Sequence, residues 1–151
     1  VEDTVWVDGT VNGRAVVATA VGKSIIINGN IIYYAKDGNH VLGLMASQDV
    51  LIPYNSPDNL EIDAGLLAQN GAAKRYNYQA GSKDRRNSIL IYGSVITYGT
   101  WTWSWVNNGG QVVSGYVNTN STYDANLTYS PPPGFPVGSE YNQISWEEVY
   151  N

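Results

Sequence analysis

The sequence of 151 residues contains no cysteine, one histidine and one phenylalanine, and only 14% of its residues are charged. The absence of cysteine excludes a disulfide scaffold and thiol chemistry. The charged fraction is well below the roughly 25% of typical domains. No apolar run approaches the roughly 20 residues that span a bilayer. The net charge of −5 argues against a dedicated nucleic-acid binder, because such proteins are usually basic overall.

Polarity comes instead from Asn, Ser, Thr and Gly, and from an aromatic content that includes 12 Tyr and 5 Trp. Aromatic side chains with a polar group suit surfaces and interfaces, and this composition is typical of extracellular proteins. By length, residues 1–151 are expected to form a single domain. The chain begins at Val1 without a signal segment, so we interpret it as a domain excised from a longer protein.

Two β-branched runs flank an Asn-Gly pair within residues 23–33. β-Branched side chains favour strands, and Asn-Gly tolerates the positive φ angles of turns. The same form, alternating apolar residues before a glycine and an apolar residue after it, recurs at 5–11 and 89–95, and residues 50–52 begin it again. The sequence therefore predicts short strands separated by frequent turns.

The spacing of these runs favours a solenoid. Runs beginning at Val5, Ile25 and Val50 are separated by 20 and 25 residues. A second series recurs alongside them at 15–19, 41–47 and 65–69. Stacked coils produce two such registers together, because each coil buries its apolar edge only against its neighbours. We therefore predict an all-β, parallel β-solenoid; an antiparallel sandwich with coincidental spacing is the alternative.

The alternation along each run also predicts the core. Residues 60–73 resemble a helix in their apolar content, but Gly65 and Gly71 would each cost about 1 kcal/mol in a helix interior, so we expect a strand here. The side chains predicted to point inward are Val5, Val7, Val17, Ile25, Ile27, Ile31, Leu44, Ala46, Val50, Ile52, Leu60, Ile62, Leu67, Ile89, Ile91 and Val95.

Five of the eight basic residues fall within residues 74–87, which carry no apolar period and are expected to form a long loop between coils. Cations beside Tyr76 and Tyr78 could contact phosphates while the rings stack on bases. A solvated insertion kept soluble by its charge is the alternative. The candidate DNA-binding residues of this loop are Lys74, Arg75, Tyr76, Lys83, Arg85 and Arg86.

Three tryptophans, Trp101, Trp103 and Trp105, alternate with Thr and Ser, so their indoles are expected to share one face of a strand. The Asn-Asn-Gly-Gly sequence at 107–110 predicts a hairpin with residues 111–117. The indoles are candidates for a stacking platform that takes DNA bases or sugar rings. The alternative is that they cover the core or an adjacent domain.

The proline-rich segment Pro131–Pro136 cannot join a central strand. We expect it to lie across the end of the stack as a C-terminal cap, because an exposed coil edge would template aggregation. The side chains expected to pack down with it are Tyr123, Leu127, Tyr129 and Phe135.

Support for catalysis is thin. Glu61 and Asp63 occupy alternate positions of one predicted strand, so they share a face and could serve sugar hydrolysis or hold a calcium ion; an ordinary solvated strand is the alternative. His40 is expected to be a loop histidine rather than a base. The sequence has no nucleotide-binding glycine loop, no zinc pattern and no nucleophile with an identifiable partner. We therefore predict a non-enzymatic protein with no cofactor and no metal.

The order of several structural motifs resembles a known family. It runs from Val5-Trp6-Val7-Asp8-Gly9 through Ile25–Ile31, Leu42–Ala46, Val50–Pro53, Leu60–Ala64 and Ile89–Ser94 to Gly115-Tyr116, Tyr123-Asp124, Leu127, Pro131–Pro133, Phe135-Pro136 and Ser145-Trp146. Over nearly the whole chain, this order resembles the β-solenoid region of large type IV pilin-like bacterial surface proteins, including the minor pilin associated with natural competence.

The resemblance implies a right-handed parallel β-helix inserted in, or following, a pilin module on the cell surface. It implies other pilus subunits as partners, a membrane anchor outside this chain and, in the competence-type member, contact with incoming DNA at the pilus tip. We therefore expect a non-enzymatic, extracellular binding module whose ligand is DNA. The alternatives are an adhesin that binds glycans or surfaces through its tryptophans, a polysaccharide-degrading enzyme that uses Glu61 and Asp63, and a structural spacer.

Overall fold

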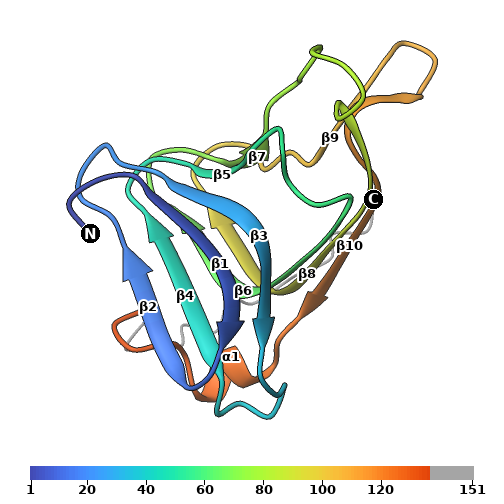
Figure 1. The fold of residues 1–151 in the computed structure, drawn as a ribbon. Helices are drawn as coiled ribbons and strands as arrows, with labels where there is room; N and C mark the ends of the chain where they lie inside the picture. Colours follow the sequence, from blue (N-terminus) through green and yellow to red (C-terminus); the bar gives the residue numbers. More distant parts are fainter. Residues whose placement is uncertain (137–151) are drawn as a thin grey trace, which may run out of the picture.

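The chain folds as a parallel β-solenoid of about four turns, with 53% of the described residues in strands and 3% in a helix (Figure 1). The computed structural model describes residues 1–136, and the Ser145-Trp146 motif lies outside them. The predicted all-β solenoid is therefore confirmed. Within the described residues, no helix is long and apolar enough to cross a membrane.

The described residues contain ten strands and one helical turn. In chain order these are β1 (Val5–Val11), β2 (Arg14–Ala18), β3 (Ile25–Tyr33), β4 (Val41–Ala46), β5 (Val50–Ile52), β6 (Asn59–Ala68), β7 (Ala73–Arg75), β8 (Arg85–Thr97), β9 (Ser104–Val106), β10 (Val112–Tyr123) and α1 (Asn126–Tyr129).

Each coil contributes to three faces, and strands of successive coils pair in parallel on each face. The first face stacks the beginnings of β1 and β3 on β5 and β7, so that Val5, Ile25, Val50 and Ala73 lie in one column. The second face stacks the ends of β1 and β3 on the first part of β6, then β8 and β10. The third face stacks β2 and β4 on the second parts of β6 and β8. Both registers predicted from the spacing are therefore confirmed.

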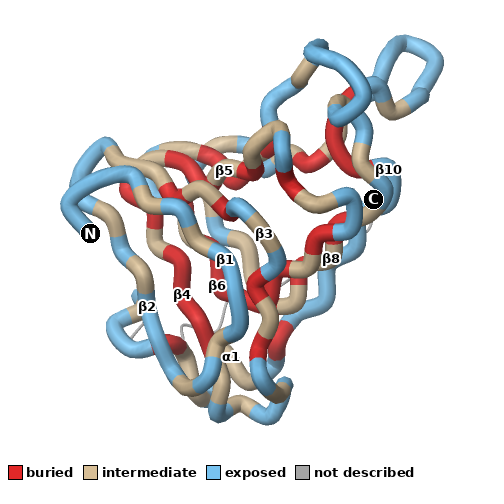
Figure 2. The backbone as a smooth tube through the Cα atoms, in the orientation of Figure 1, coloured by how far each residue is buried: buried red, intermediate tan, exposed pale blue. Residues whose placement is uncertain are grey.

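The core is a set of apolar columns that run through the stack, and Figure 2 shows buried residues as red segments of neighbouring strands. Val5, Val7, Val17 and Val95, which were also predicted to point inward, are only partly buried because they belong to the outer coils. The predicted inward residues that are buried are Ile25, Ile27, Ile31, Leu44, Ala46, Val50, Ile52, Leu60, Ile62, Ile89 and Ile91.

The prediction for Leu67 is wrong, because its neighbour Leu66 is the residue that points inward. β6 runs from Asn59 to Ala68, and its pairing with β8 continues without a register shift. The alternation that buries Leu60 and Ile62 therefore continues and buries Leu66, which pairs with Leu44 of the coil before. Leu67 faces outward, where it lines a surface cavity beside Met45.

The two ends of the solenoid differ in polarity. On the last coil, Thr119 and Ser121 of β10 pair with the inward-facing Ile89 and Ile91, so a polar strand closes the second face. A polar edge strand resists pairing with another chain. On the first coil, the apolar interior opens into a cavity of about 320 Å³ that Val7, Val11, Val17, Ile31, Leu42 and Leu44 help to line.

The proline-rich segment covers the side of the stack, so the prediction that it lies across the end is wrong. Phe135 packs on the third face over Gly43 and Gly65, and a Cβ atom at Gly43 would lie 2.6 Å from the ring. The two glycines provide a flat surface on two neighbouring coils, which holds the ring in place. Leu127 packs against the core as expected, whereas Tyr123 and Tyr129 are exposed.

The segment after β10 also returns the chain to the first coil. The Arg14 guanidinium of β2 donates to the Ser130 hydroxyl at 2.6 Å and to the carbonyl of Pro131. Pro136 lines a cavity together with Ala18, and the Val1 amino group donates to the Ala18 carbonyl at 2.7 Å. Val1 therefore lies beside the end of β2, whereas Pro136 lies farther along the third face, since it also lines a cavity with Ser94 and Ile96 of β8.

The inward position of Leu66 predicts a large difference between two neighbouring substitutions. Leu66→Ala removes a fully buried side chain and is expected to lower the free energy of unfolding by about 2–5 kcal/mol. Leu67→Ala, on the outer surface, is expected to lower it by about 1 kcal/mol or less. Urea unfolding followed by tryptophan fluorescence measures both, and equal losses would contradict the observed register.

Candidate functional site

Arg75, predicted to contact DNA, is buried and serves as an internal anchor. Residues 73–75 form β7, which pairs with β5, so the expected long loop begins only at Tyr76. The Arg75 side chain is fully buried, and its guanidinium donates to the carbonyls of Asp84 at 2.9 Å and Lys83 at 2.8 Å. Arg75 is therefore unavailable to phosphates, and its side chain instead holds the far end of the loop.

The loop of residues 76–84 is ordered by further contacts. The Asp84 carboxylate accepts from the backbone N–H groups of Ala80 and Gly81, which closes a tight turn. Tyr78 lies between the ring of Tyr54, at a centroid distance of 5.2 Å, and the Arg75 guanidinium, which sits 4.8 Å from its centroid. This packing fixes the position of the basic residues that follow.

The remaining basic candidates differ in how far they are available. Lys74 forms an ion pair with Asp49 at 3.0 Å and lies 5.4 Å from the centroid of the Tyr76 ring. Arg86 is half-buried and donates to the Tyr54 carbonyl. Lys83 and Arg85 are exposed, although the Lys83 ammonium donates to the Asn55 side chain at 3.0 Å. Among residues 1–136, two of the five predicted cations therefore have neither a carboxylate partner nor a burying contact.

The three tryptophans do not share one face of a strand. Thr102 bridges to Lys74 and extends the first face by one residue, and the strand β9 begins only at Ser104. Trp103 is 2% exposed and closes the end of the core, so it cannot stack on a ligand. The predicted hairpin, by contrast, is confirmed by the antiparallel pairing of β9 with β10.

Trp101 and Trp105 remain accessible beside the buried Trp103. Trp101 is 49% exposed, and its ring centroid lies 6.0 Å from that of Trp103. Trp105 is 37% exposed, and its indole N–H donates to the Arg75 carbonyl at 2.9 Å. This hydrogen bond places Trp105 next to Tyr76, because Tyr76 follows Arg75 directly.

These contacts bring five exposed side chains onto one end of the solenoid, which we call the terminal surface. Arg75 links three of them, since it contacts Lys83 and Trp105 and directly precedes Tyr76. Gly115 brings Arg85 close to β9, because it pairs with both Arg85 and Ser104. In Figure 1, the loop of residues 76–84 and the β9–β10 hairpin project together from this end. The terminal surface consists of Tyr76, Lys83, Arg85, Trp101 and Trp105.

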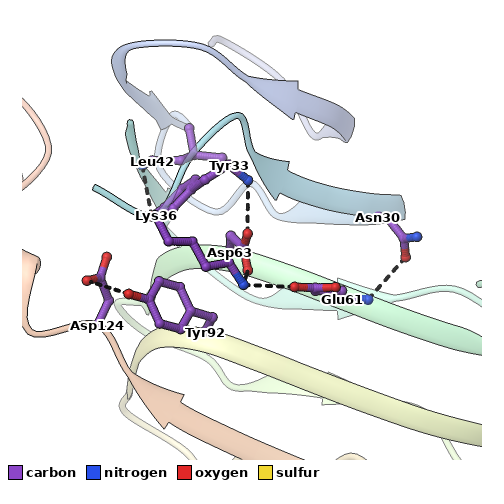
Figure 3. A network of polar contacts seen from close by, with 8 residues as sticks. All are labelled: Asn30, Tyr33, Lys36, Leu42, Glu61, Asp63, Tyr92 and Asp124. Carbon is purple, nitrogen blue, oxygen red and sulfur yellow. Dashed lines mark hydrogen bonds and ion pairs between the residues drawn. The ribbon is translucent and has the colours of Figure 1, made fainter. Parts of the chain in front are cut away.

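The two acids Glu61 and Asp63 share one face of β6, as predicted, but a lysine occupies the space between them (Figure 3). The Lys36 ammonium lies 2.9 Å from Glu61 Oε1 and 3.0 Å from Asp63 Oδ1. Burial raises the pKa of Asp63 above its usual range. The pair therefore lacks the open gap for a water and a sugar that a glycosidase requires.

Tyr33 and Tyr92 enclose this polar cluster. The Lys36 ammonium lies 4.3 Å from the centroid of the Tyr92 ring, and the Tyr92 hydroxyl donates to Asp124 at 3.1 Å. The Tyr33 hydroxyl accepts from the Leu42 N–H at 3.2 Å. Burial raises the pKa of Tyr33 to about 12. His40, expected in a loop, lies between β3 and β4 and accepts from the Gly13 N–H at 2.8 Å.

Sequence reasoning missed two residues of the site. Tyr54 lies in the segment between β5 and β6, where Pro53 and Pro57 interrupt the apolar pattern and no local motif indicates a site. Lys36 lies in the connection between β3 and β4, and nothing in its local sequence indicates that it reaches β6. No group of three or more His, Cys, Asp or Glu side chains that could hold a metal ion occurs among residues 1–136.

No protein-family model matches this chain, and no curated protein or solved structure matches it. The resemblance to pilin-like solenoids therefore stays a hypothesis.

The anchoring role of Arg75 predicts a local change on substitution by lysine. Arg75→Lys removes most of its hydrogen bonds to the loop, and a hydrogen bond from a charged group contributes about 1.5–3 kcal/mol. Trypsin is therefore expected to cleave after Lys83 at least about tenfold faster, because local opening exposes that bond. The variant keeps a trypsin site at position 75, and Lys23→Arg provides a control. An unchanged rate would contradict the anchoring role.

The buried Tyr33 hydroxyl predicts a loss of stability in alkali. The folded state holds this proton up to about pH 12, whereas the unfolded state loses it near pH 10. Because the folded state then binds more protons, wild-type stability falls as pH rises through this window. Tyr33→Phe is expected to be less stable at neutral pH, since the Leu42 hydrogen bond is lost. Its stability should fall less steeply above pH 10, which urea unfolding at several pH values measures.

Proposed function

We propose that this domain is an extracellular, non-enzymatic binding module of a pilus-like surface protein, and that its ligand is DNA. The observation that carries the proposal is the terminal surface, because three exposed aromatic rings and two exposed cations occupy the same end of the solenoid. Proteins that bind single-stranded nucleic acids combine these two features, because rings stack on unpaired bases while cations contact phosphates.

Each residue type has a separate part in this proposal. Tyr76, Trp101 and Trp105 supply stacking surfaces, and base–aromatic stacking contributes about 1–3 kcal/mol per base. Lys83 and Arg85 supply phosphate contacts. Because the whole chain carries a net charge of −5, the remaining surface repels the DNA backbone and restricts binding to this end. Single strands are favoured over duplexes, since stacking on the rings requires unpaired bases.

The place of the terminal surface suits display. Val1 lies beside β2, at the first coil, whereas Trp101 and Trp105 lie at the last coil. A pilin module and other pilus subunits are the proposed partners, with a membrane anchor outside this chain. The resemblance to pilin-like solenoids supports this context, in which the terminal surface points away from the pilus.

A titration of a labelled single-stranded oligonucleotide, followed by fluorescence anisotropy, tests the proposal. With two phosphate contacts, affinity is expected to fall about sevenfold between roughly 50 and 200 mM salt. The double variant Lys83→Ala/Arg85→Ala should lose most binding and most of the salt dependence. Lys23→Ala removes one charge at the first coil and should bind as the wild type does.

Two results would overturn the DNA proposal. One is an affinity that does not change with salt. The other is equal binding by the wild type and the double variant, which would place any binding elsewhere on the chain.

Adhesion to glycans is the second candidate, and the balance of the terminal surface favours it. The terminal surface has three exposed rings and two exposed cations. Lys74, a further cation nearby, forms an ion pair with Asp49 that neutralises its charge. Aromatic rings pack on the apolar faces of sugars without needing charge. Glycan binding is expected to be insensitive to salt and to be lost in Trp101→Ala. A domain that binds neither DNA nor glycans would be a structural spacer.

A further inference from the structure

Three side chains with complementary chemistry meet on the outside of the second face, in the cluster drawn in Figure 3. Lys36 comes from the connection between β3 and β4, whereas Glu61 and Asp63 come from β6 in the next coil. The Lys36 ammonium lies 2.9 Å from Glu61 Oε1 and 3.0 Å from Asp63 Oδ1. An amine, a carboxyl group and a second carboxyl group are therefore in direct contact.

The two oxygens of Asp63 have different environments. Oδ2 accepts from the backbone N–H of Tyr33 at 2.9 Å. Oδ1 is buried and faces the Lys36 ammonium at 3.0 Å, in an ion pair whose angles are poor for a hydrogen bond. The oxygen that would leave if Lys36 and Asp63 condensed is therefore the one that faces the amine.

We propose that Lys36 and Asp63 form an intramolecular amide bond between Lys36 Nζ and Asp63 Cγ, and that Glu61 transfers the proton in this step. The ammonium and the carboxylate together yield one amide and one water. No oxidant, reductant or cofactor is needed for the balance.

The step follows from the positions of the three groups. A proton moves from Lys36 to Asp63, which gives a neutral amine and a carboxylic acid. The amine lone pair attacks Cγ and forms the C–N bond, while the negative charge on Oδ2 is held by the Tyr33 N–H. Glu61 takes a proton from Nζ and delivers it to Oδ1. The bond from Cγ to Oδ1 then breaks, and Oδ1 leaves as water.

The surroundings favour the reaction in two ways. Asp63 is fully buried, and burial favours the neutral forms of both partners. Holding an amine against a carboxyl group also gives effective concentrations of roughly 10⁵–10⁸ M. For Lys36, burial lowers the pKa, but the contacts with the carboxylates of Glu61 and Asp63 outweigh this effect and the pKa is raised overall. The neutral amine is therefore the minor form, which suits a slow reaction that occurs once in each molecule.

The product would link two coils covalently in a chain that has no cysteine. The bond closes a loop between positions 36 and 63, and such a closure restricts the unfolded state as a disulfide does. Oδ2 becomes the amide oxygen and keeps its hydrogen bond from Tyr33. The Tyr92 ring, 4.3 Å from Lys36 Nζ, then covers the new bond.

Intact-mass measurement of the full chain, after incubation at neutral pH, tests the proposal. The wild type is expected to be lighter than its sequence mass by one water, and Lys36→Arg to have its sequence mass. Protease digestion of the wild type should yield one branched peptide that contains both Lys36 and Asp63. Glu61→Gln should slow the mass change at least about tenfold, because proton transfer by a positioned side chain typically accelerates a reaction about 10²–10⁴-fold.

Succinimide formation at Asp8-Gly9 or Asp37-Gly38 also removes one water, so a control is needed. A succinimide would persist in Lys36→Arg and would be opened by hydroxylamine. An amide between side chains resists hydroxylamine. A wild-type chain at its full sequence mass would overturn the proposal. So would a loss of water that Lys36→Arg retains or that hydroxylamine reverses.

Discussion

The structure depends on one constraint: every coil must place its apolar side chains directly over those of the coil before it. Parallel pairing enforces this, because a shift of one residue would move the whole apolar set of a strand to the outside. The column from Val17 through Leu44 and Leu66 to Val95 shows the result on the third face. Backbones approach so closely in this arrangement that a Cβ atom at Gly93 would lie 1.9 Å from the Ala64 carbonyl oxygen.

The sequence reveals this constraint wherever a coil carries enough apolar residues to mark its period. Runs beginning at Val5, Ile25 and Val50 do so, and the fold follows from them. The next strand of that series, Ala73–Arg75, carries an alanine and an arginine at its inward positions, so its sequence pattern predicts a loop. The alternation of the tryptophans predicts a strand that begins too early, because Trp103 turns inward to close the core and no local pattern records that turn.

The candidate site is less predictable than the fold, because its geometry comes from distant segments. Composition identifies residues 74–87 as basic, but it does not reveal the separation between a buried Arg75 and an exposed Lys83. That separation depends on carbonyl groups of Tyr54 and Asp84, which surround the Arg75 guanidinium and bury its charge. In the same way, alternate spacing reveals that Glu61 and Asp63 share a face, whereas Lys36, more than 20 residues earlier, decides what that face can do.

The proline-rich segment has a geometric consequence for the length of the stack. Pro131 accepts from Arg14 of the first coil, whereas Pro136 lines a cavity with Ser94 of the last coil. The segment between them therefore crosses every coil of the third face. Each added or deleted coil would change the length to be crossed by about 4.8 Å, the spacing of paired strands. A change in the number of coils would therefore require a matching change in the length of this segment.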